Sequence, residues 1–438
     1  MKKIILLISI IWYNYSAASL PYPIHSRTLS NGLKIIVCEK NTNPMAQIEV
    51  WYRVGSKDEW DGVRGMAHLF EHMMFRGSKK FVGNTSPDKT IERVGGSSNA
   101  YTMTDRTVYH EEVPASSIET FIEMEADRME NLLLDQKLLD AEREVVGEEL
   151  RLGINNWYSK MVSERYPALY PGGHPYKVDV IGNLNEIVTF TTKQCQDFYN
   201  KYYSPNNAFV VITGNVKADQ IFSLCEKYFG VIKKQLPLNI KKTEPDVFSH
   251  YITLDEMQID FPVQIYSYII PSPAFGHKDY YAFNLLSELL FSNSNSLLNR
   301  RLVNGNLAYD IQGTQDESRM YSAFTTFDII MDVKVGNAKV IKEVSREINN
   351  IIAEGVDDAD LKDYLRNLEN KNMFRAYSNA EICGELGFAE YYLGDYNNYD
   401  KKLEEYKKIT SNELKRIAET YFNPEKMKVI NIKPIEKE

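Results

Sequence analysis

Several features that would assign a chain to a particular protein class are scarce or missing here. The four cysteines are scattered and include no Cys-x-x-Cys pair: Cys38, Cys195, Cys225 and Cys383. This arrangement indicates neither a metal site built from cysteine nor a disulfide framework, so we expect buried free thiols. Positive charge is not in excess, since the formal net charge is -9, and this argues against a nucleic-acid partner. No apolar run approaches the roughly 20 residues of a membrane helix.

What is present is an ordinary globular composition with an export signal in front of it. The chain has 438 residues, of which 43% are hydrophobic, enough for two or more domains. Lys2 and Lys3 precede the apolar run 4–12, and small residues follow at 16–18. This order is typical of a secretory signal peptide, which we place at residues 1–18. We therefore expect a secreted protein, periplasmic or extracellular, without a stable membrane anchor.

An internal repeat divides the rest of the chain. Residues 191–212 pair with residues 410–431 at an offset of 219, which is 424 minus 205 and brings Pro205 against Pro424. Each segment reads as an amphipathic helix, a proline break and a short strand. The matching order of so many positions predicts a duplication.

The repeat sets the predicted domain boundaries. A polar, proline-containing linker at 233–249 separates an N-terminal half, 19–232, from a C-terminal half, 250–438. Each half mixes strands and helices, which predicts an α+β sandwich. The segments expected as strands are 32–38, 46–54 and 99–113, and those expected as helices are 116–134, 135–155, 279–291 and 338–353.

Residues 68–72 read His-Leu-Phe-Glu-His within a mostly apolar helical segment. On a helix, His68, Glu71 and His72 share one face, because positions i, i+3 and i+4 lie together. Two imidazoles at this spacing can bind one zinc ion, and the carboxylate beside them can act as a general base. A shared cation would also satisfy three polar groups on an otherwise apolar helix.

A catalytic zinc needs a third protein ligand, and the helix expected at 135–155 offers two candidates. One face of that helix, which we expect to be buried, carries Leu138, Glu142, Val145, Val146, Glu149 and Leu152. Carboxylates on such a face are costly unless they are paired. One of Glu142 and Glu149 could bind the metal while the other supports it, and periodicity does not say which. An intrahelical salt-bridge network would explain both residues without a metal.

These residues, taken together, resemble the M16 metallopeptidases, or inverzincins, which include the mitochondrial processing peptidase, insulysin, pitrilysin and many bacterial zinc proteases. Segment 65–81 is similar to the family's GlAHxxEHmxFxGt motif, and Glu149 follows His72 by 77 positions. Segment 95–110 (GGSSNAYTMTDRTVYH) and segment 172–182 (GGHPYKVDVIG) also match family motifs. The resemblance covers nearly the whole chain after the signal peptide.

The resemblance implies that Glu149 is the third zinc ligand and that Glu142 is a supporting catalytic acid. It also implies two duplicated αββα-type sandwich halves, the LuxS/MPP-like metallohydrolase fold, enclosing a chamber with zinc in the first half. Adding 219 to His68, Glu71 and Glu149 gives residues that cannot repeat the metal set: Ser287, Leu290 and Leu368. We therefore expect one Zn²⁺ per chain. The expected activity is that of a zinc metalloendopeptidase, which hydrolyses peptides or unfolded polypeptide segments through a zinc-activated water with Glu71 as general base.

The resemblance further implies substrate contacts. Asn99, Ala100 and Tyr101 correspond to the edge strand where a substrate backbone adds as an extra strand. The family often holds the substrate carbonyl with an Arg and a Tyr seven residues apart. Here Tyr309 is present, but Arg301 and Arg300 lie out of register, so either a shifted pair or a partner subunit could supply this clamp. His110 and His174 also match family positions, and we interpret them as structural.

Two other functions stay open. Some family members are non-catalytic structural subunits, and a peptide-binding subunit of an M16-like complex is also conceivable. Such relatives usually lack part of the metal set, whereas this chain retains all five residues of it, so catalysis is favoured. We expect a homodimer or a heterodimer with an M16-like partner.

Overall fold

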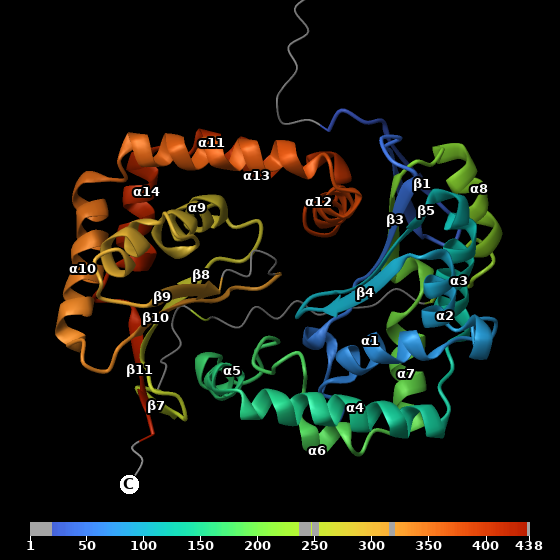
Figure 1. The fold of residues 1–438 in the computed structure, drawn as a ribbon, viewed down its shortest axis with the longest axis horizontal. Helices are drawn as coiled ribbons and strands as arrows, with labels where there is room; N and C mark the ends of the chain where they lie inside the picture. Colours follow the sequence, from blue (N-terminus) through green and yellow to red (C-terminus); the bar gives the residue numbers. More distant parts are fainter. Residues whose placement is uncertain (1–19, 236–246, 248–253, 315–319, 436–438) are drawn as a thin grey trace, which may run out of the picture.

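The computed structural model describes residues 20–235, 247, 254–314 and 320–435, and they form two α+β halves that lie side by side (Figure 1). The signal peptide predicted at 1–18 lies outside the described residues. The linker predicted at 233–249 lies mostly outside them as well.

The first half is built around one sheet. Its strands are β1 (Ile24–Thr28), β2 (Lys34–Glu39), β3 (Met45–Tyr52), β4 (Ser97–Thr102), β5 (Thr107–Pro114) and β6 (Ala208–Gly214). Its helices are α1 (Met66–Arg76), α2 (Pro87–Val94), α3 (Ile118–Asn131), α4 (Gln136–Asn155), α5 (Trp157–Leu169), α6 (Leu184–Ile187), α7 (Thr192–Tyr202) and α8 (Ala218–Tyr228).

The second half has its own sheet. Its strands are β7 (Glu256–Ile259), β8 (Gln264–Ser272), β9 (Asp310–Thr314), β10 (Ala323–Met331) and β11 (Lys428–Pro434). Its helices are α9 (Tyr280–Phe291), α10 (Asn337–Glu354), α11 (Asp358–Arg375), α12 (Asn379–Tyr392), α13 (Lys401–Lys408) and α14 (Ser411–Ile417).

Apart from β1, which has no counterpart among the described residues, the two sheets share one topology, which confirms the predicted duplication. The first has the order β1-β2-β6-β3-β5-β4 and the second β7-β11-β8-β10-β9. Each contains one parallel pair, β2 with β6 and β7 with β11, among antiparallel neighbours. The starts of β3 and β8, of α3 and α10, and of α7 and α14 all differ by 219 (264 minus 45, 337 minus 118, 411 minus 192).

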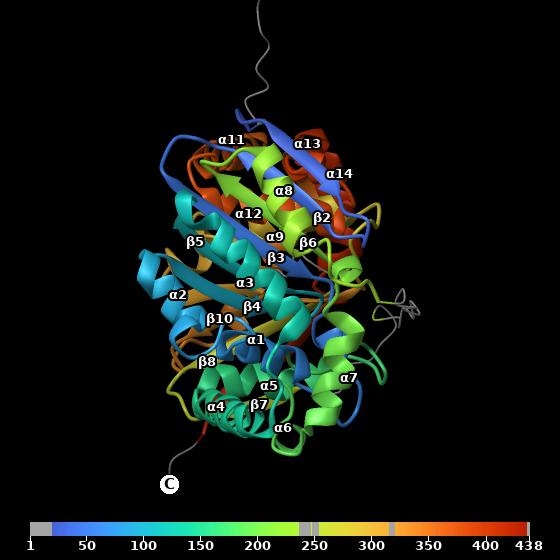
Figure 2. The same cartoon turned by 90° about the vertical axis from the view of Figure 1, so that its right-hand side faces the viewer.

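One face of each sheet is covered by helices of the same half. In the first half, the side chains that alternate along β3 at Ala46, Ile48 and Val50 are buried in one core with α1, α3, α7 and α8. Figure 2 shows α3 and α8 lying across this face. In the second half, α9, α10 and α14 pack in the same way on β8 and β10. The period-two pattern of β3 therefore places Ala46, Ile48 and Val50 together on the face that helices of the first half cover.

The opposite face of each sheet is covered by a helix from the other half. Ile382, Cys383 and Leu386 of α12 pack against β2, β3 and β6 of the first sheet. Met161 and Leu169 of α5 pack against β7, β8 and β11 of the second sheet. The halves are thus joined by a reciprocal exchange of helices, visible where α5 and α12 lie between the two sheets in Figure 1.

One element differs from its prediction. Segment 99–113, expected as a single strand, is a hairpin in which β4 and β5 pair and residues 103–106 form the turn. The turn is fixed by contacts distant in sequence, because the Asp105 carboxylate accepts hydrogen bonds from the Tyr176 hydroxyl at 2.9 Å and from the Met320 N–H at 3.1 Å. Local sequence contains no glycine or proline that would mark it.

The remaining features are simpler. All four cysteines are buried free thiols. Across the described parts of the chain, no helix combines the length and the apolar character that crossing a bilayer requires.

Candidate active site

The helix α1 presents its polar residues on one face and buries the other. Met66, Leu69, Phe70, Met73 and Met74 lie in the core of the first half. This leaves the side chains at 68, 71 and 72 on the remaining face, only partly buried.

The start of α1 is anchored from outside the helix. The buried carboxylate of Glu59 accepts hydrogen bonds from the N–H groups of Gly65 and Ala67, each at 2.8 Å. These N–H groups have no partner within the helix, so Glu59 satisfies two of them at once. Gly65 has φ +97°, and the loop before α6 approaches it so closely that a Cβ would lie 2.8 Å from the Ile181 carbonyl.

The helix α4 packs against α1 and brings a carboxylate, the predicted third ligand, to its two histidines. Asp135 begins α4 by accepting the Leu138 N–H at 2.9 Å. Two turns before the C-terminus of α4, the Glu149 carboxylate lies 3.9 Å from Nε2 of His68 and 3.4 Å from Nε2 of His72. The Glu149 side chain is 49% exposed, so solvent reaches the cluster from this side.

The three side chains fit a zinc ion. Zinc holds nitrogen and carboxylate oxygen at about 2.0–2.2 Å in a tetrahedron, which places the ligand atoms about 3.4 Å apart. One ligand atom from each of His68, His72 and Glu149 lies within 4.8 Å of the others, and among the described residues no other group of this kind occurs. Burial, together with the neighbouring His72, lowers the pKa of His68 to about 4, which keeps its imidazole neutral as a metal ligand must be.

Glu142 contacts His72 of this cluster from its buried side. Its side chain is 1% exposed and lies 3.6 Å from Nδ1 of His72, with Arg76 as a second ion-pair partner. The nearby carboxylate of Glu142 raises the pKa of His72. Burial raises the pKa of Glu142, but His72 and Arg76 outweigh it and hold that pKa below its usual value. A carboxylate on the second nitrogen fixes the orientation of a metal-binding imidazole.

Glu71 lies beside the cluster without joining it. The Thr102 hydroxyl of β4 donates a hydrogen bond to its Oε2 at 2.7 Å. Burial raises the pKa of Glu71, and the bond from Thr102 opposes this shift. A carboxylate beside the cluster, held by a hydrogen bond, is placed to act as a proton acceptor.

β4 is the edge strand of the first sheet and contains the predicted substrate-binding residues. It pairs with β5 on one side only. Ala100 is buried toward α1, Asn99 is exposed, and the Tyr101 ring lies on the opposite face near the His110 ring, 6.5 Å between centroids. The open edge of β4 therefore runs past Glu71.

A cleft of about 1300 Å³ adjoins the cluster. Glu149, Leu152 and Asn156 form one wall, and Tyr321 of the second half contributes to another. His174 is buried beside it, where its Nε2 lies 3.0 Å from the Ser322 carbonyl, consistent with a structural role. The cleft gives the metal cluster access to solvent and to both halves.

The other predicted clamp residues lie elsewhere. Arg301 forms ion pairs with Glu343 at 3.1 Å and with Glu347 of α10, and Tyr309 is 60% exposed with its hydroxyl 2.9 Å from Asp332. In the described structure, neither side chain contacts the cluster, so their role stays a prediction.

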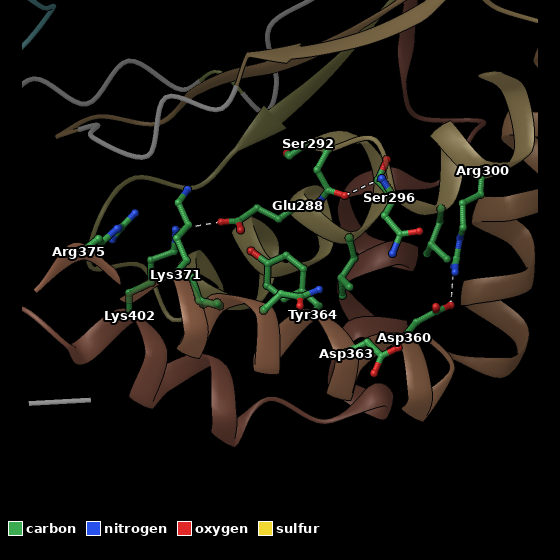
Figure 3. Close-up of a pocket in the computed structure, with 16 residues that line it drawn as sticks. Glu288, Ser292, Ser296, Arg300, Asp360, Asp363, Tyr364, Lys371, Arg375 and Lys402 are labelled. Carbon is green, nitrogen blue, oxygen red and sulfur yellow. Dashed lines mark hydrogen bonds and ion pairs between the residues drawn. The ribbon is translucent and has the colours of Figure 1, made fainter. Parts of the chain in front are cut away.

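Arg300 lies in a separate pocket of about 440 Å³ between α9 and α11, the helices that correspond to α1 and α4 (Figure 3). There it pairs with Asp360 at 2.7 Å, while Glu288 pairs with Lys402 at 3.0 Å. Leu368, which corresponds to Glu149 at the offset of 219, lines this pocket, and a leucine side chain binds no metal.

Comparisons with known proteins agree with this geometry. Residues 34–175 match the family described as Insulinase (Peptidase family M16), and residues 189–368 match the Peptidase M16 inactive domain. The chain belongs to peptidase family M16. All five residues of the metal set lie within the first of these two matches.

Individual M16 relatives extend the match to more than nine-tenths of the chain. Zinc protease PqqE of Helicobacter pylori is 27% identical over 426 residues, covering 93% of this chain and 92% of that protein. The crystal structure of a protease from Helicobacter pylori has a TM-score of 0.86 at 24% identity, covering 94% of this chain and 100% of that one. That of the periplasmic protease PqqL from Escherichia coli has a TM-score of 0.74 at 18% identity, covering 96% of this chain and 48% of that one.

Three residues of this M16 site were not identified from the sequence. Thr102 directly follows the predicted substrate residues, so the same strand pattern could have indicated it. Arg76 lies four residues after His72, on the same helical face, and could have been paired with Glu142. Glu59 had no local signal, because its contact with α1 arises from the path of a loop.

The predicted buried face of α4 also needs a correction. Glu142 and Val146 are buried as expected, but Val145 is 43% exposed and Leu152 is 69% exposed. Leu139 and Leu150 take their places in the core. The reason is that the last turns of α4 border the cleft, and Leu152 lines it.

Proposed function

We propose that this chain is a zinc-dependent endopeptidase that cleaves peptides or unfolded polypeptide segments. The convergence of His68, His72 and Glu149 next to Glu71 carries the proposal, and relatives named zinc proteases support it. We assign the zinc-bearing catalytic domain to residues 19–232 and the metal-free domain to residues 250–438, with one zinc ion per chain. The fold likeness to a periplasmic protease supports secretion to the periplasm or beyond, with residues 1–18 as signal peptide.

The chemistry needs one metal and one base. A zinc ion held by His68, His72 and Glu149 would polarise the scissile carbonyl and make water a better nucleophile. Glu71 accepts the proton of that water and delivers it to the leaving amine. The hydrogen bond from Thr102 holds its carboxylate beside the cluster for both tasks. Glu142 keeps His72 oriented throughout.

The substrate is proposed to bind through its main chain. An extended peptide adds to the open edge of β4 at Asn99, Ala100 and Tyr101, and its flanking residues occupy the cleft. Such binding selects chains that are unfolded or already extended. Tyr309 and Arg301, or a partner subunit of a homodimer or heterodimer, would hold the scissile carbonyl.

A non-catalytic or peptide-binding subunit is the alternative. The match to a family described as an inactive domain covers residues 189–368, whereas the metal set lies outside that range. A binding subunit would have no need for Glu71 beside three metal-binding groups. The geometry therefore favours the enzyme.

The test is hydrolysis by the purified chain 19–438 alone. With one equivalent of zinc, it should cleave an unfolded polypeptide, lose this activity with a chelator and regain it when zinc is restored. Glu71→Gln should retain zinc and lose hydrolysis, and it serves as the matched control for contaminating proteases. A zinc-loaded chain that binds the polypeptide without cleaving it would establish the alternative.

A further inference from the structure

The strand that would bind the substrate also contacts the proposed base. Thr102 is the last residue of β4, and its hydroxyl donates to Glu71 at 2.7 Å. Within the described structure, no other side chain donates a hydrogen bond to this carboxylate. The orientation of Glu71 therefore depends on the position of one residue of the edge strand.

The main chain of the same residue faces the open edge. Next to the pair Thr102–Thr107, the Met103 N–H donates to the Arg106 carbonyl at 2.7 Å, which makes 103 and 106 a hydrogen-bonded pair. Hydrogen-bonded and non-hydrogen-bonded pairs alternate along an antiparallel ladder. The main-chain groups of Thr102, and of Ala100 two residues earlier, therefore point away from β5, toward the open edge. There the Thr102 N–H faces the Glu71 carboxylate, and the Thr102 carbonyl faces the N–H of an added strand.

Threonine transmits backbone position to its hydroxyl more strictly than serine does. Its branched Cβ restricts rotation about χ1, so the hydroxyl follows the main chain closely. An edge strand with one neighbour has fewer fixed hydrogen bonds than a strand with two. The turn at 103–106 already anchors the end of this strand, and a peptide paired with Thr102 would add a second neighbour along its open edge and restrict the hydroxyl further.

We propose that Thr102 is a positioning residue that couples occupation of the β4 edge by substrate to the orientation of Glu71. This inference rests on the proposed function. It means that main-chain pairing at Thr102 contributes to the rate of cleavage and not only to binding. A substrate that cannot pair there would bind with its scissile bond near a base that is poorly oriented.

The first test compares Thr102→Val, which keeps the shape and removes the donor, with Thr102→Ser, which retains the donor. The valine variant should retain its zinc and its KM for an unfolded peptide, while kcat falls about ten- to hundred-fold, the usual effect of one hydrogen bond to a charged group. The serine variant should stay within a few-fold of the parent. An unchanged kcat in the valine variant overturns the inference.

The second test addresses the coupling. One peptide is made with and without an N-methyl group on the amide that would pair with Thr102. In the parent, methylation should lower kcat, and in the valine variant this effect on kcat should disappear, because the two changes break the same link. Additive losses of kcat would show that pairing and base orientation are independent.

Crystal structures of the zinc-loaded parent and both variants give a readout without turnover. The Glu71 carboxylate should hold its place in the parent and in Thr102→Ser, and turn away in Thr102→Val. If the parent does not hydrolyse peptides, the proposed function fails while this comparison still decides the positioning role. An unmoved Glu71 in the valine variant would overturn the inference on its own.

Discussion

Replacing Arg165 with methionine should weaken the attachment of the two halves to each other. Arg165 lies on α5 of the first half and is 1% exposed, and its guanidinium pairs with Asp328 of β10 at 2.8 Å. The Ser267 hydroxyl of β8 also contacts it. Removing one member of a buried ion pair leaves the other charge without compensation, at a cost of about 3–5 kcal/mol. This is a large fraction of the about 5–15 kcal/mol by which folded proteins are stable.

A double-mutant cycle tests this prediction. Arg165→Met, Asp328→Leu and the double variant are unfolded in urea at pH 7 without metal, and amide hydrogen exchange along α5 reports local detachment. Each single variant should lose about 3–5 kcal/mol, whereas the double variant should be more stable than either, because it buries no unpaired charge. Single variants within about 0.5 kcal/mol of the parent, or a double variant that loses the sum of both, would refute the argument.

Three further predictions concern the first half. Burial raises the pKa of Glu49 from 4.5 to about 7, against the opposing hydrogen bond from Trp51, so the folded state retains a proton that the unfolded state releases. The free energy of unfolding should therefore fall by about 3 kcal/mol as pH rises from about 4.5 to 7. In Glu49→Gln, the free energy of unfolding measured in urea should depend less on pH over that range. An unchanged pH dependence in this variant would exclude Glu49 as its source. Glu149→Ala should lose zinc and Glu142→Ala should bind it about 10- to 100-fold more weakly, measured by elemental analysis and chelator competition; full occupancy in the first would exclude Glu149 as a ligand. Glu59→Ala should lower the free energy of unfolding by about 1–3 kcal/mol because two N–H groups of α1 lose their acceptor, and calorimetry showing no change would contradict this.

The metal cluster could be predicted from the sequence to the extent that its spacing is local. His68, Glu71 and His72 share a helical face by periodicity alone, and the structure indeed presents them together. Periodicity left Glu142 and Glu149 equivalent, because both recur on one face two turns apart. The family resemblance assigned them different roles, and the packing of α4 on α1 gives the physical difference, burying Glu142 and leaving Glu149 half exposed.

What could not be predicted depends on contacts between distant segments. The turn at 103–106 is held by the hydrogen bonds of Asp105 with Tyr176 and Met320. The alternation of side chains in the sequence contains no sign of these contacts, so it predicted one continuous strand. The exposure of Leu152 follows from the cleft, which exists because two halves meet there. The duplication was visible in the sequence, but the exchange of α5 and α12 was not, since an amphipathic helix carries no mark of the sheet that it covers.

The crossing of α5 and α12 has a consequence for the integrity of the molecule. If the chain were divided in the middle, each fragment would expose one apolar face of its sheet to water. Each fragment would also carry a helix, α5 or α12, without the sheet that it covers. The two fragments should therefore aggregate when produced separately and be rescued when produced together. If the two halves descend from a single unit, this unit would first have formed a dimer. In that dimer, each copy would have covered the sheet of the other with the helix that corresponds to α5 and α12.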